Sequence, residues 1–349
     1  MIAAAEWIRR KLVVVFCLGA LAWPALANAA DPGQADSFVG SNKKLIVAVF
    51  PGGFNWPLWI VKERGIDNAL RLNIEIIAIR NSEEQMAGLQ AGKFDMVMTG
   101  FDNVIAYGGR PTRKAPPLIR AVMGGDSGLL SLVSRSELDN YTALKGRNIG
   151  VDSERTGYAF VLYGLLEANG LAKNDYTVVK AGGVKQRFEA LNAGAIDATL
   201  LVTPFDDLAI SKGAKRLERV SEALGAYQGY VGATRTKWAE ENRQHVVNYV
   251  SGYRQALGWL FNPRNKQAAL EAYVKHVEGA TLEQARLAYD VLIAGPNGIN
   301  RTAKFDARGA ANVLRLRKQF GGPEWSDLAD AMIYFDPTYY RQASRSTDN

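Results

Sequence analysis

A weak internal repeat is the sequence feature that most constrains the fold of this chain. Residues Met86–Met98 align with Phe188–Leu200 at an offset of 102 residues. Each copy predicts an amphipathic helix, a glycine stop and a strand, and each is followed by a Phe-Asp pair, at Phe101 and at Phe205. A period near one hundred residues is too long for a solenoid repeat. The repeat therefore indicates two α/β lobes of similar build.

The pattern along the chain supports this organisation. Short apolar runs alternate with amphipathic segments from Lys44 to Ser211, which favours α/β layers with parallel strand pairs. The helix expected at Ser82–Ala91 has Ser82 as its N-cap and Gln85 as the partner in a capping box. After a strand at Tyr230–Ala233 the remainder is expected to be helical, at Lys237–Phe261, Lys266–His276, Leu282–Ile293 and Ala307–Phe320, with a loose end at 341–349.

The first 29 residues have the pattern of a secretory signal peptide. Three basic residues at 9–11 precede an apolar run over Leu12–Leu26, and the small residues at 27–29 fit a signal-peptidase site. The alternative is a membrane anchor, but the apolar run is shorter than the roughly twenty residues that a spanning helix needs. Residues 30–43 are expected to form a flexible leader. The sequence thus predicts an exported chain.

Composition and motifs argue against catalysis, metal binding and nucleic-acid binding. The chain has 349 residues, one Cys and two His, which excludes a disulfide framework and zinc-finger spacing. Residues 125–128 (Gly-Asp-Ser-Gly) resemble the surroundings of a serine-protease nucleophile, yet His245 and His276 both come later, in the wrong order for that triad. The net charge of +7 comes from scattered basic residues without an aromatic stripe. We expect a protein without catalytic residues, cofactor or metal.

Two α/β lobes predict a ligand cleft between them, at the carboxyl ends of parallel strands. Four segments would face this cleft. Their candidate ligand-binding residues are Phe54, Asn55, Trp56, Thr99, Asp102, Asn103, Ser153, Arg155, Thr156, Tyr158, Thr203 and Asp206.

Each of these segments also has a purely structural interpretation. Asn55 would cap a helix and Trp56 would lie in the core, and Asp102 would cap the helix that it begins. At residues 152–158, the free N–H groups of a helix start favour an anion. The structural interpretation of Thr156 in this segment is that it merely caps the helix. Thr203 has the weakest functional case, because a helix cap explains its whole motif.

Two of these segments carry a resemblance to a known family. Residues 54–65 (Phe-Asn-Trp-Pro-Leu-Trp-Ile-Val-Lys-Glu-Arg-Gly) and 85–103 resemble the periplasmic solute-binding proteins of ABC importers, in the nitrate, taurine, alkanesulfonate and thiamine-pyrimidine group. The resemblance extends from Lys44 to Val220. It implies a type II periplasmic-binding fold, with lobe 1 at 44–131 plus 229–349 and lobe 2 at 132–228.

The resemblance also implies a function. The chain is expected to be a monomeric periplasmic receptor that closes its lobes on a small molecule and delivers it to a membrane permease. Two alternatives share the fold. One is a binder of a thiamine-pyrimidine-type compound or a biosynthetic relative, whose cysteine-rich motif is missing here. The other is the ligand-binding subunit of a periplasmic sensor.

The charge of the ligand stays open at this point. Arg155 at a helix start favours a sulfonate or carboxylate, whereas Asp102, Asp126 and Asp206 could instead receive an amine or a pyrimidine-like ring. Our hypothesis is a small organic anion, with an aromatic ring as one option. On this hypothesis Arg155→Ala weakens binding about ten- to a hundredfold.

The signal peptide gives the first testable prediction. Because Ala27-Asn28-Ala29 fits a cleavage site, the exported protein is expected to begin at Ala30. N-terminal sequencing of the protein recovered from the periplasm measures this directly. An intact Met1 on the exported protein would contradict the prediction.

Overall fold

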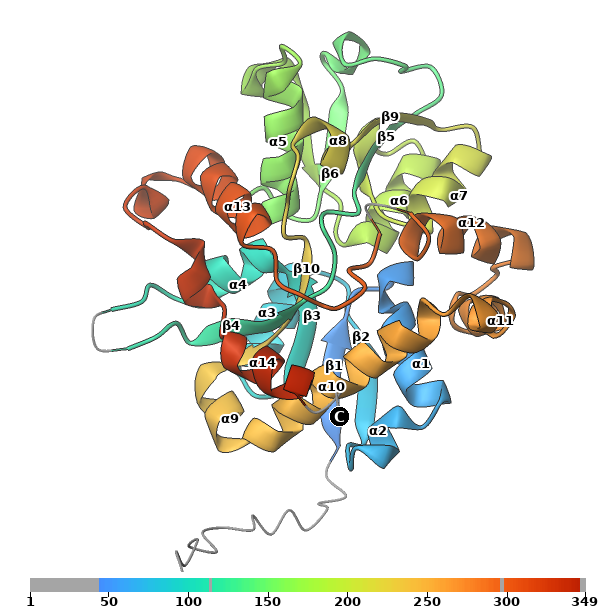
Figure 1. The fold of residues 1–349 in the computed structure, drawn as a ribbon. Coiled ribbons are helices and arrows are strands. Elements are labelled where there is room, and N and C mark those ends of the chain that lie inside the picture. Colours follow the sequence, from blue (N-terminus) through green and yellow to red (C-terminus); the bar gives the residue numbers. More distant parts are fainter. Residues whose placement is uncertain (1–43, 113–114, 296–297, 346–349) are drawn as a thin grey trace, which may run out of the picture. The chain divides into compact units, whose positions relative to one another are not determined.

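The computed structural model describes residues 44–112, 115–295 and 298–345 (Figure 1). The predicted signal peptide at 1–29 and the leader at 30–43 lie outside the described residues. Within these ranges, no helix combines the length and apolar character needed to cross a membrane.

The first sheet has the strand order β2-β1-β3-β10-β4. Its strands are β1 (Leu45–Val49), β2 (Ile74–Ala78), β3 (Met96–Gly100), β4 (Ile119–Gly124) and β10 (Tyr230–Arg235). Strand β1 pairs in parallel with β2 and β3, and places Val47 beside Ile76 and Met96. Strand β10 is antiparallel to both β3 and β4. Four of the five residues of β3 are buried, as expected for a central strand covered on both faces.

The second sheet repeats this layout. Its strands are β5 (Ser131–Ser134), β6 (Asn148–Val151), β7 (Thr177–Lys180), β8 (Ala198–Leu201) and β9 (Lys215–Arg219), in the order β7-β6-β8-β5-β9. Strand β6 is parallel to β7 and β8, and β5 is antiparallel to β8 and β9. In each sheet, three parallel strands lie side by side, and the next strand in the sheet, β10 or β5, is antiparallel to them. Each of these antiparallel strands is the first strand that follows a connection from the other sheet. This arrangement confirms the predicted type II periplasmic-binding fold.

Fourteen helices are described around these sheets (Figure 1). The helices before strand β10 are α1 (Trp56–Glu63), α2 (Ile66–Ala69), α3 (Ser82–Gln90), α4 (Phe101–Tyr107), α5 (Gly157–Ala168), α6 (Val184–Asn192), α7 (Phe205–Ser211) and α8 (Val220–Ala223). The helices after β10 are α9 (Thr236–Glu241), α10 (Arg243–Leu260), α11 (Lys266–His276), α12 (Leu282–Leu292), α13 (Ala307–Phe320) and α14 (Pro337–Arg345).

We call residues 45–124 and 230–235 lobe A, and residues 131–219 lobe B. Two crossings, at 125–130 and 220–229, join them. The helices after residue 235 do not pack on one lobe alone. Helix α10 packs against α1 and α14 beside lobe A, whereas α13 contacts both α5 of lobe B and α4 of lobe A (Figure 1). The α13 helix is thus a third link between the lobes.

The repeat in the sequence has an equivalent structural role in both lobes. Asp95 Oδ2 accepts a hydrogen bond from Ile46 N at 2.9 Å, and Asp197 Oδ2 accepts one from Asn148 N at 2.8 Å. Each aspartate thereby fixes the end of a strand against its parallel neighbour. The glycine predicted to end the helix in each copy of the repeat is also confirmed, since Gly92 and Gly194 have left-handed φ values of 76° and 72°.

The C-terminal helices differ from the sequence prediction at two places. The single helix expected over Lys237–Phe261 is two helices, because Asn242 leaves the helical region with ψ 37°. The end of the chain was expected to be loose from residue 341, but α14 continues to Arg345. Tyr339 and Ala343 of α14 are buried, because this mostly polar segment has a narrow apolar face that packs against the rest of the protein.

Candidate functional site

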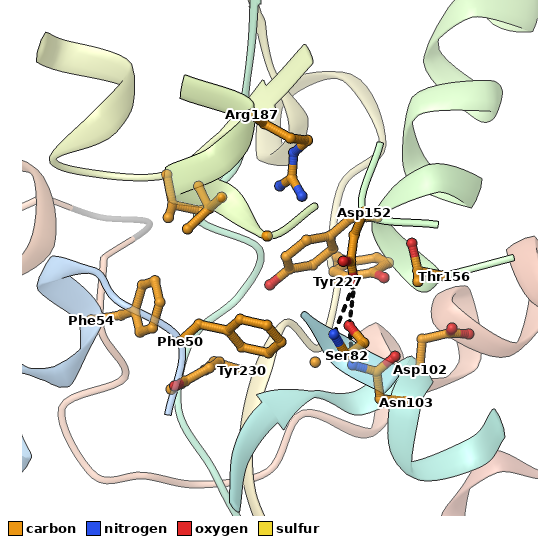
Figure 2. Close-up of a pocket in the computed structure, with 16 residues that line it drawn as sticks. Phe50, Phe54, Ser82, Asp102, Asn103, Asp152, Thr156, Arg187, Tyr227 and Tyr230 are labelled. Carbon is orange, nitrogen blue, oxygen red and sulfur yellow. Dashed lines mark hydrogen bonds between the residues drawn. The ribbon is translucent and has the colours of Figure 1, made fainter. Parts of the chain in front are cut away.

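A pocket lies between the two lobes, next to the ends of the parallel strands (Figure 2). Both lobes and the second crossing supply its walls. The side chains that line it are Phe50, Phe54, Ser82, Asp102 and Asn103 from lobe A, Asp152, Thr156, Tyr158, Val184, Arg187 and Val202 from lobe B, and Tyr227 and Tyr230.

The lobes touch each other around this pocket. Gly53 N donates to Thr203 O, and Gly183 N donates to Arg80 O, each at 3.0 Å. At Gly157 the approach is so close that a Cβ would lie 2.3 Å from the Cβ of Asp102. Glycine is therefore required where α5 meets α4, and the structure has the lobes closed on the pocket.

Arg187 is the most unusual side chain of the pocket. It lies on the buried face of α6, three residues after Val184, and is 3% exposed. Its Nε and Nη2 donate to Leu200 O at 3.3 and 3.1 Å, and Nη1 donates to Gly182 O at 2.8 Å. Burial lowers the pKa of the guanidinium, and the Asp152 carboxylate opposes this shift from a distance. Within the described part of the chain, no carboxylate forms an ion pair with Arg187.

The hydrogen-bonding capacity of Arg187 is only partly used. A guanidinium has five N–H bonds, and three of them reach backbone carbonyl oxygens. The remaining two lie one on each terminal nitrogen, an arrangement that suits a bidentate oxyanion. Figure 2 shows the guanidinium pointing from α6 toward the part of the pocket where Asp152 and Tyr227 lie.

Two helix N-termini point at the same pocket. Helix α5 begins at Gly157 and α6 at Val184, and neither has a side chain that caps its free N–H groups. Thr156 precedes α5, yet its hydroxyl donates to Ser153 O instead. Uncapped N–H groups and the positive end of a helix dipole favour a negative group. The electrostatics of lobe B thus agree with Arg187.

Asp102 lines the pocket but already has a cation. Arg317 of α13 donates from Nε to Oδ1 at 2.6 Å and from Nη2 to Oδ2 at 2.5 Å. Arg317 Nη2 also donates to Arg155 O in lobe B, and its guanidinium lies 5.0 Å from the ring centre of Phe160 and 4.7 Å from that of Trp325. The pair is buried and joins α13 to both lobes.

The start of α3 differs from the predicted capping box. Asn81 is the N-cap and accepts from Glu84 N at 2.8 Å, so Ser82 and Gln85 are free for other partners. Ser82 N and Oγ donate across the lobe boundary to Asp152 Oδ2, at 3.3 and 2.5 Å. The prediction was wrong because Asn81 is an equally good cap one residue earlier.

Aromatic rings form the wall opposite Arg187. The rings of Phe54 and Tyr230 lie 4.4 Å apart between centroids, and Phe50 continues this surface (Figure 2). Tyr158 lies on the lobe B side, where burial raises its pKa above 10.0 and keeps the phenol neutral. A flat or apolar group fits between such walls.

Five of the thirteen predicted ligand residues line this pocket. They are Phe54, Asp102, Asn103, Thr156 and Tyr158. Among them, the carboxylate of Asp102 is neutralised by Arg317, so the expectation that Asp102 receives an amine has lost its physical basis.

Three of the other candidates support the pocket from behind. Asn55 donates to Phe50 O at 2.6 Å and accepts from the Tyr230 hydroxyl at 3.2 Å. Thr99 accepts from Asn103 Nδ2 at 3.0 Å. Trp56 is fully buried, and its indole N–H donates to a carbonyl of α11, so its structural interpretation holds.

Asp126 lies in the first crossing and not on the pocket surface. Its Oδ1 accepts from Gly128 N and Leu129 N at 2.7 and 3.3 Å, and its Oδ2 accepts from Tyr230 N at 3.1 Å. Burial raises the pKa of this carboxyl, while the three backbone N–H groups act to lower it. The backbone oxygen of Asp126 also accepts from Gly229 N at 3.2 Å and from Gln228 Nε2 at 3.1 Å, so this residue holds the two crossings together.

The four remaining candidates lie outside the pocket. Ser153 is half-buried and uses its carbonyl to hold Thr156. Arg155 is exposed and pairs with Glu324. Thr203 and Asp206 face a separate hollow, where Asp206 accepts from Arg216 and from the Ser131 hydroxyl. The structure thus places Arg155 away from the position that the sequence predicted for it.

Sequence reasoning missed Arg187, although the repeat contained the signal. Extending the aligned segments by one residue places Arg187 opposite Gln85. In the structure Gln85 Nε2 donates to Met98 O and Arg187 donates to Leu200 O, and these strand residues are also 102 apart. The two side chains have the same place under their sheets, and only lobe B has a charge there.

Comparison with known proteins identifies the family of this chain and structures that share its fold. A family described as NMT1/THI5 like matches residues 62–266, more than half of the chain. The chain belongs to this NMT1/THI5-like family. The match confirms the resemblance to the nitrate, sulfonate and thiamine-pyrimidine group. None of the curated proteins compared with the chain matches it.

Solved structures share the fold of this NMT1/THI5-like protein. The alkanesulfonate-binding protein SsuA of Xanthomonas axonopodis pv. citri, bound to MOPS, has a TM-score of 0.67 and 17% identity, over 84% of this chain and 98% of that one. The nitrate-binding protein NrtA of Synechocystis PCC 6803 has a TM-score of 0.70 and 10% identity, over 87% and 88%. A ligand-binding component of an ABC-type import system of Staphylococcus aureus, with zinc bound, has a TM-score of 0.69 and 13% identity, over 87% and 100%. Such low identities show the fold alone.

In the described part of this NMT1/THI5-like protein, no three His, Cys, Asp or Glu side chains are grouped so that they could hold a metal ion.

The buried ion pair gives a stability prediction. Arg317→Met leaves the Asp102 carboxylate buried without a cation, and we expect a loss of about 3–5 kcal/mol in the free energy of unfolding. Urea unfolding at neutral pH measures it. Arg155→Met is the matched control, since it removes an exposed arginine from the same region and should cost about 1 kcal/mol or less. Equal losses for the two variants would contradict a special role of the Asp102–Arg317 pair.

Proposed function

We propose that this NMT1/THI5-like protein is the extracytoplasmic solute-binding receptor of an ABC importer, and that its solute carries a small organic anionic group. The observation that carries the proposal is Arg187, a buried guanidinium with two unused N–H bonds in a pocket between two lobes. The uncapped starts of α5 and α6 support an anion in the same place.

The mechanism needs no covalent chemistry. Because lobe A supplies the aromatic wall and lobe B supplies Arg187, a solute in the pocket contacts both lobes only when they are closed. Its binding free energy therefore shifts the population toward the closed arrangement, which a permease can distinguish from the open one. The lobes move about the two crossings that Asp126 ties together.

The partner, location and reaction class follow as parts of the same proposal. We propose a periplasmic monomer that delivers the solute to a membrane permease, as the S. aureus neighbour's description as part of an ABC-type import system suggests. Binding is favoured over catalysis because the residues described around the pocket include neither histidine nor cysteine. A sensor subunit would use the same pocket, and permease genes or a histidine kinase gene beside its own gene would separate the two.

Arg187→Gln is the variant that tests the proposal. Glutamine occupies the equivalent position in lobe A and bonds there to the strand carbonyl, so the substitution should preserve the fold and remove only the charge. In a thermal-shift screen of aromatic and aliphatic sulfonates and carboxylates, a hit at a hundred times its Kd should add about 2.7 kcal/mol of stability to the wild type. Titration calorimetry should then show an affinity lower by about a hundredfold in the variant.

The control is Arg155→Ala, which the structure now predicts to bind like the wild type because Arg155 pairs with Glu324 away from the pocket. Wild-type affinity in Arg187→Gln, together with a hundredfold loss in Arg155→Ala, would contradict the proposal. That result would indicate that the anion binds at Arg155, as the sequence predicted.

A further inference from the structure

Resting on the proposed function, we infer that the solute carries an amine as well as an anionic group, and that the amine is received by Asp152. The solute is then an amphoteric molecule of zero net charge, such as an aminoalkyl-substituted aromatic sulfonate or carboxylate. Arg187 binds its negative end.

The first observation is a carboxylate with an unused oxygen. Asp152 follows strand β6, lines the pocket and is 8% exposed. Its Oδ2 accepts from Ser82 N and Ser82 Oγ, whereas no described group donates to Oδ1. Throughout the described ranges, Asp152 forms no ion pair. A buried carboxylate without a cation is costly unless a partner arrives.

The second observation is the charge balance of the pocket. Asp102 and Arg317 neutralise each other in contact, so Asp152 and Arg187 are the charges that face the solute. A simple anion would compensate Arg187 and leave Asp152 buried beside a second negative group. A simple amine would do the reverse. A solute with both groups compensates both residues, and the total charge of the closed pocket stays zero.

The third observation is the placement of these groups. Asp152 and Arg187 both belong to lobe B, and they also line one small cavity together with Tyr158. The aromatic side chains Phe50 and Tyr230 lie across the pocket from Arg187 (Figure 2). Two charged substituents on a ring that lies against the aromatic wall would reach both residues. The Asn103 amide donates to the Ser82 hydroxyl and so holds in place the group that donates to Asp152.

Asp152 has a competing structural role, because its bonds to Ser82 also close the lobes. The two roles are separable by variants. Ser82→Ala removes the hydroxyl contact across the lobes and keeps the carboxylate, whereas Asp152→Asn removes the negative charge and keeps a side chain of the same shape.

The experiment uses pairs of solutes that differ by one ammonium group. The first pair is 4-methylbenzenesulfonate and 4-(aminomethyl)benzenesulfonate, and the others are the 3-substituted isomers and the corresponding benzoates. Titration calorimetry with the mature protein measures both affinities of each pair. In at least one pair we expect the wild type to bind the ammonium member about tenfold or more tightly.

The variants decide which residue produces this preference. In Asp152→Asn the preference should fall to about threefold or less, while the methyl member binds at least as tightly as it does to the wild type, because a carboxylate no longer lies beside its sulfonate. Binding of the methyl member also shows that the variant is folded. In Ser82→Ala the preference should persist, with any loss shared by both members.

The contrary outcomes separate the two proposals. A wild type that binds the methyl and ammonium members equally, or an Asp152→Asn protein that keeps the preference, overturns this inference and leaves the receptor proposal intact. A wild type that binds no member of any pair also overturns this inference, whereas an Arg187→Gln protein that binds them as well as the wild type overturns the proposed function itself.

Discussion

The burial of one guanidinium governs the rest of this site. Arg187 is 3% exposed, and three backbone hydrogen bonds replace only part of the water that it has lost. The uncapped starts of α5 and α6 add positive potential and do not relieve it. In the proposed function, the anionic group of the solute is the missing partner of this guanidinium. This charge, which has no carboxylate in contact with it, makes two lobes of the same layout unequal at the pocket, because lobe A has the neutral Gln85 in the corresponding place.

Closure of the lobes depends on contacts that surround this charge. Asp126 joins the two crossings, and Arg317 brings α13 against Asp102 on one lobe and Arg155 O on the other. These residues hold the walls in register while leaving the pocket side of Arg187 open. Helix α13 thus contributes to the site, since Arg317 neutralises the Asp102 carboxylate, which would otherwise repel the proposed anion.

The sequence predicted the fold well because its determinants are local and periodic. The repeat around Asp95 and Asp197 specified helix, turn and strand in both lobes, and the hydrogen bonds of these aspartates are equivalent. The site was harder, because a candidate such as Arg155 was chosen for its neighbours in sequence. Its orientation toward Glu324 depends on a segment 169 residues away. Arg187 was missed because the repeat pairs it with Gln85 in sequence but does not show that this position faces a pocket, which depends on the opposing sheet and lobe.

A crystal structure of the protein with an aromatic sulfonate tests the central claim most directly. The account predicts sulfonate oxygens within hydrogen-bond distance of both terminal nitrogens of Arg187, with the ring against Phe50 and Tyr230. A sulfonate bound elsewhere, or one that enters the pocket while the Arg187 guanidinium keeps backbone carbonyls as its sole partners, would contradict the account.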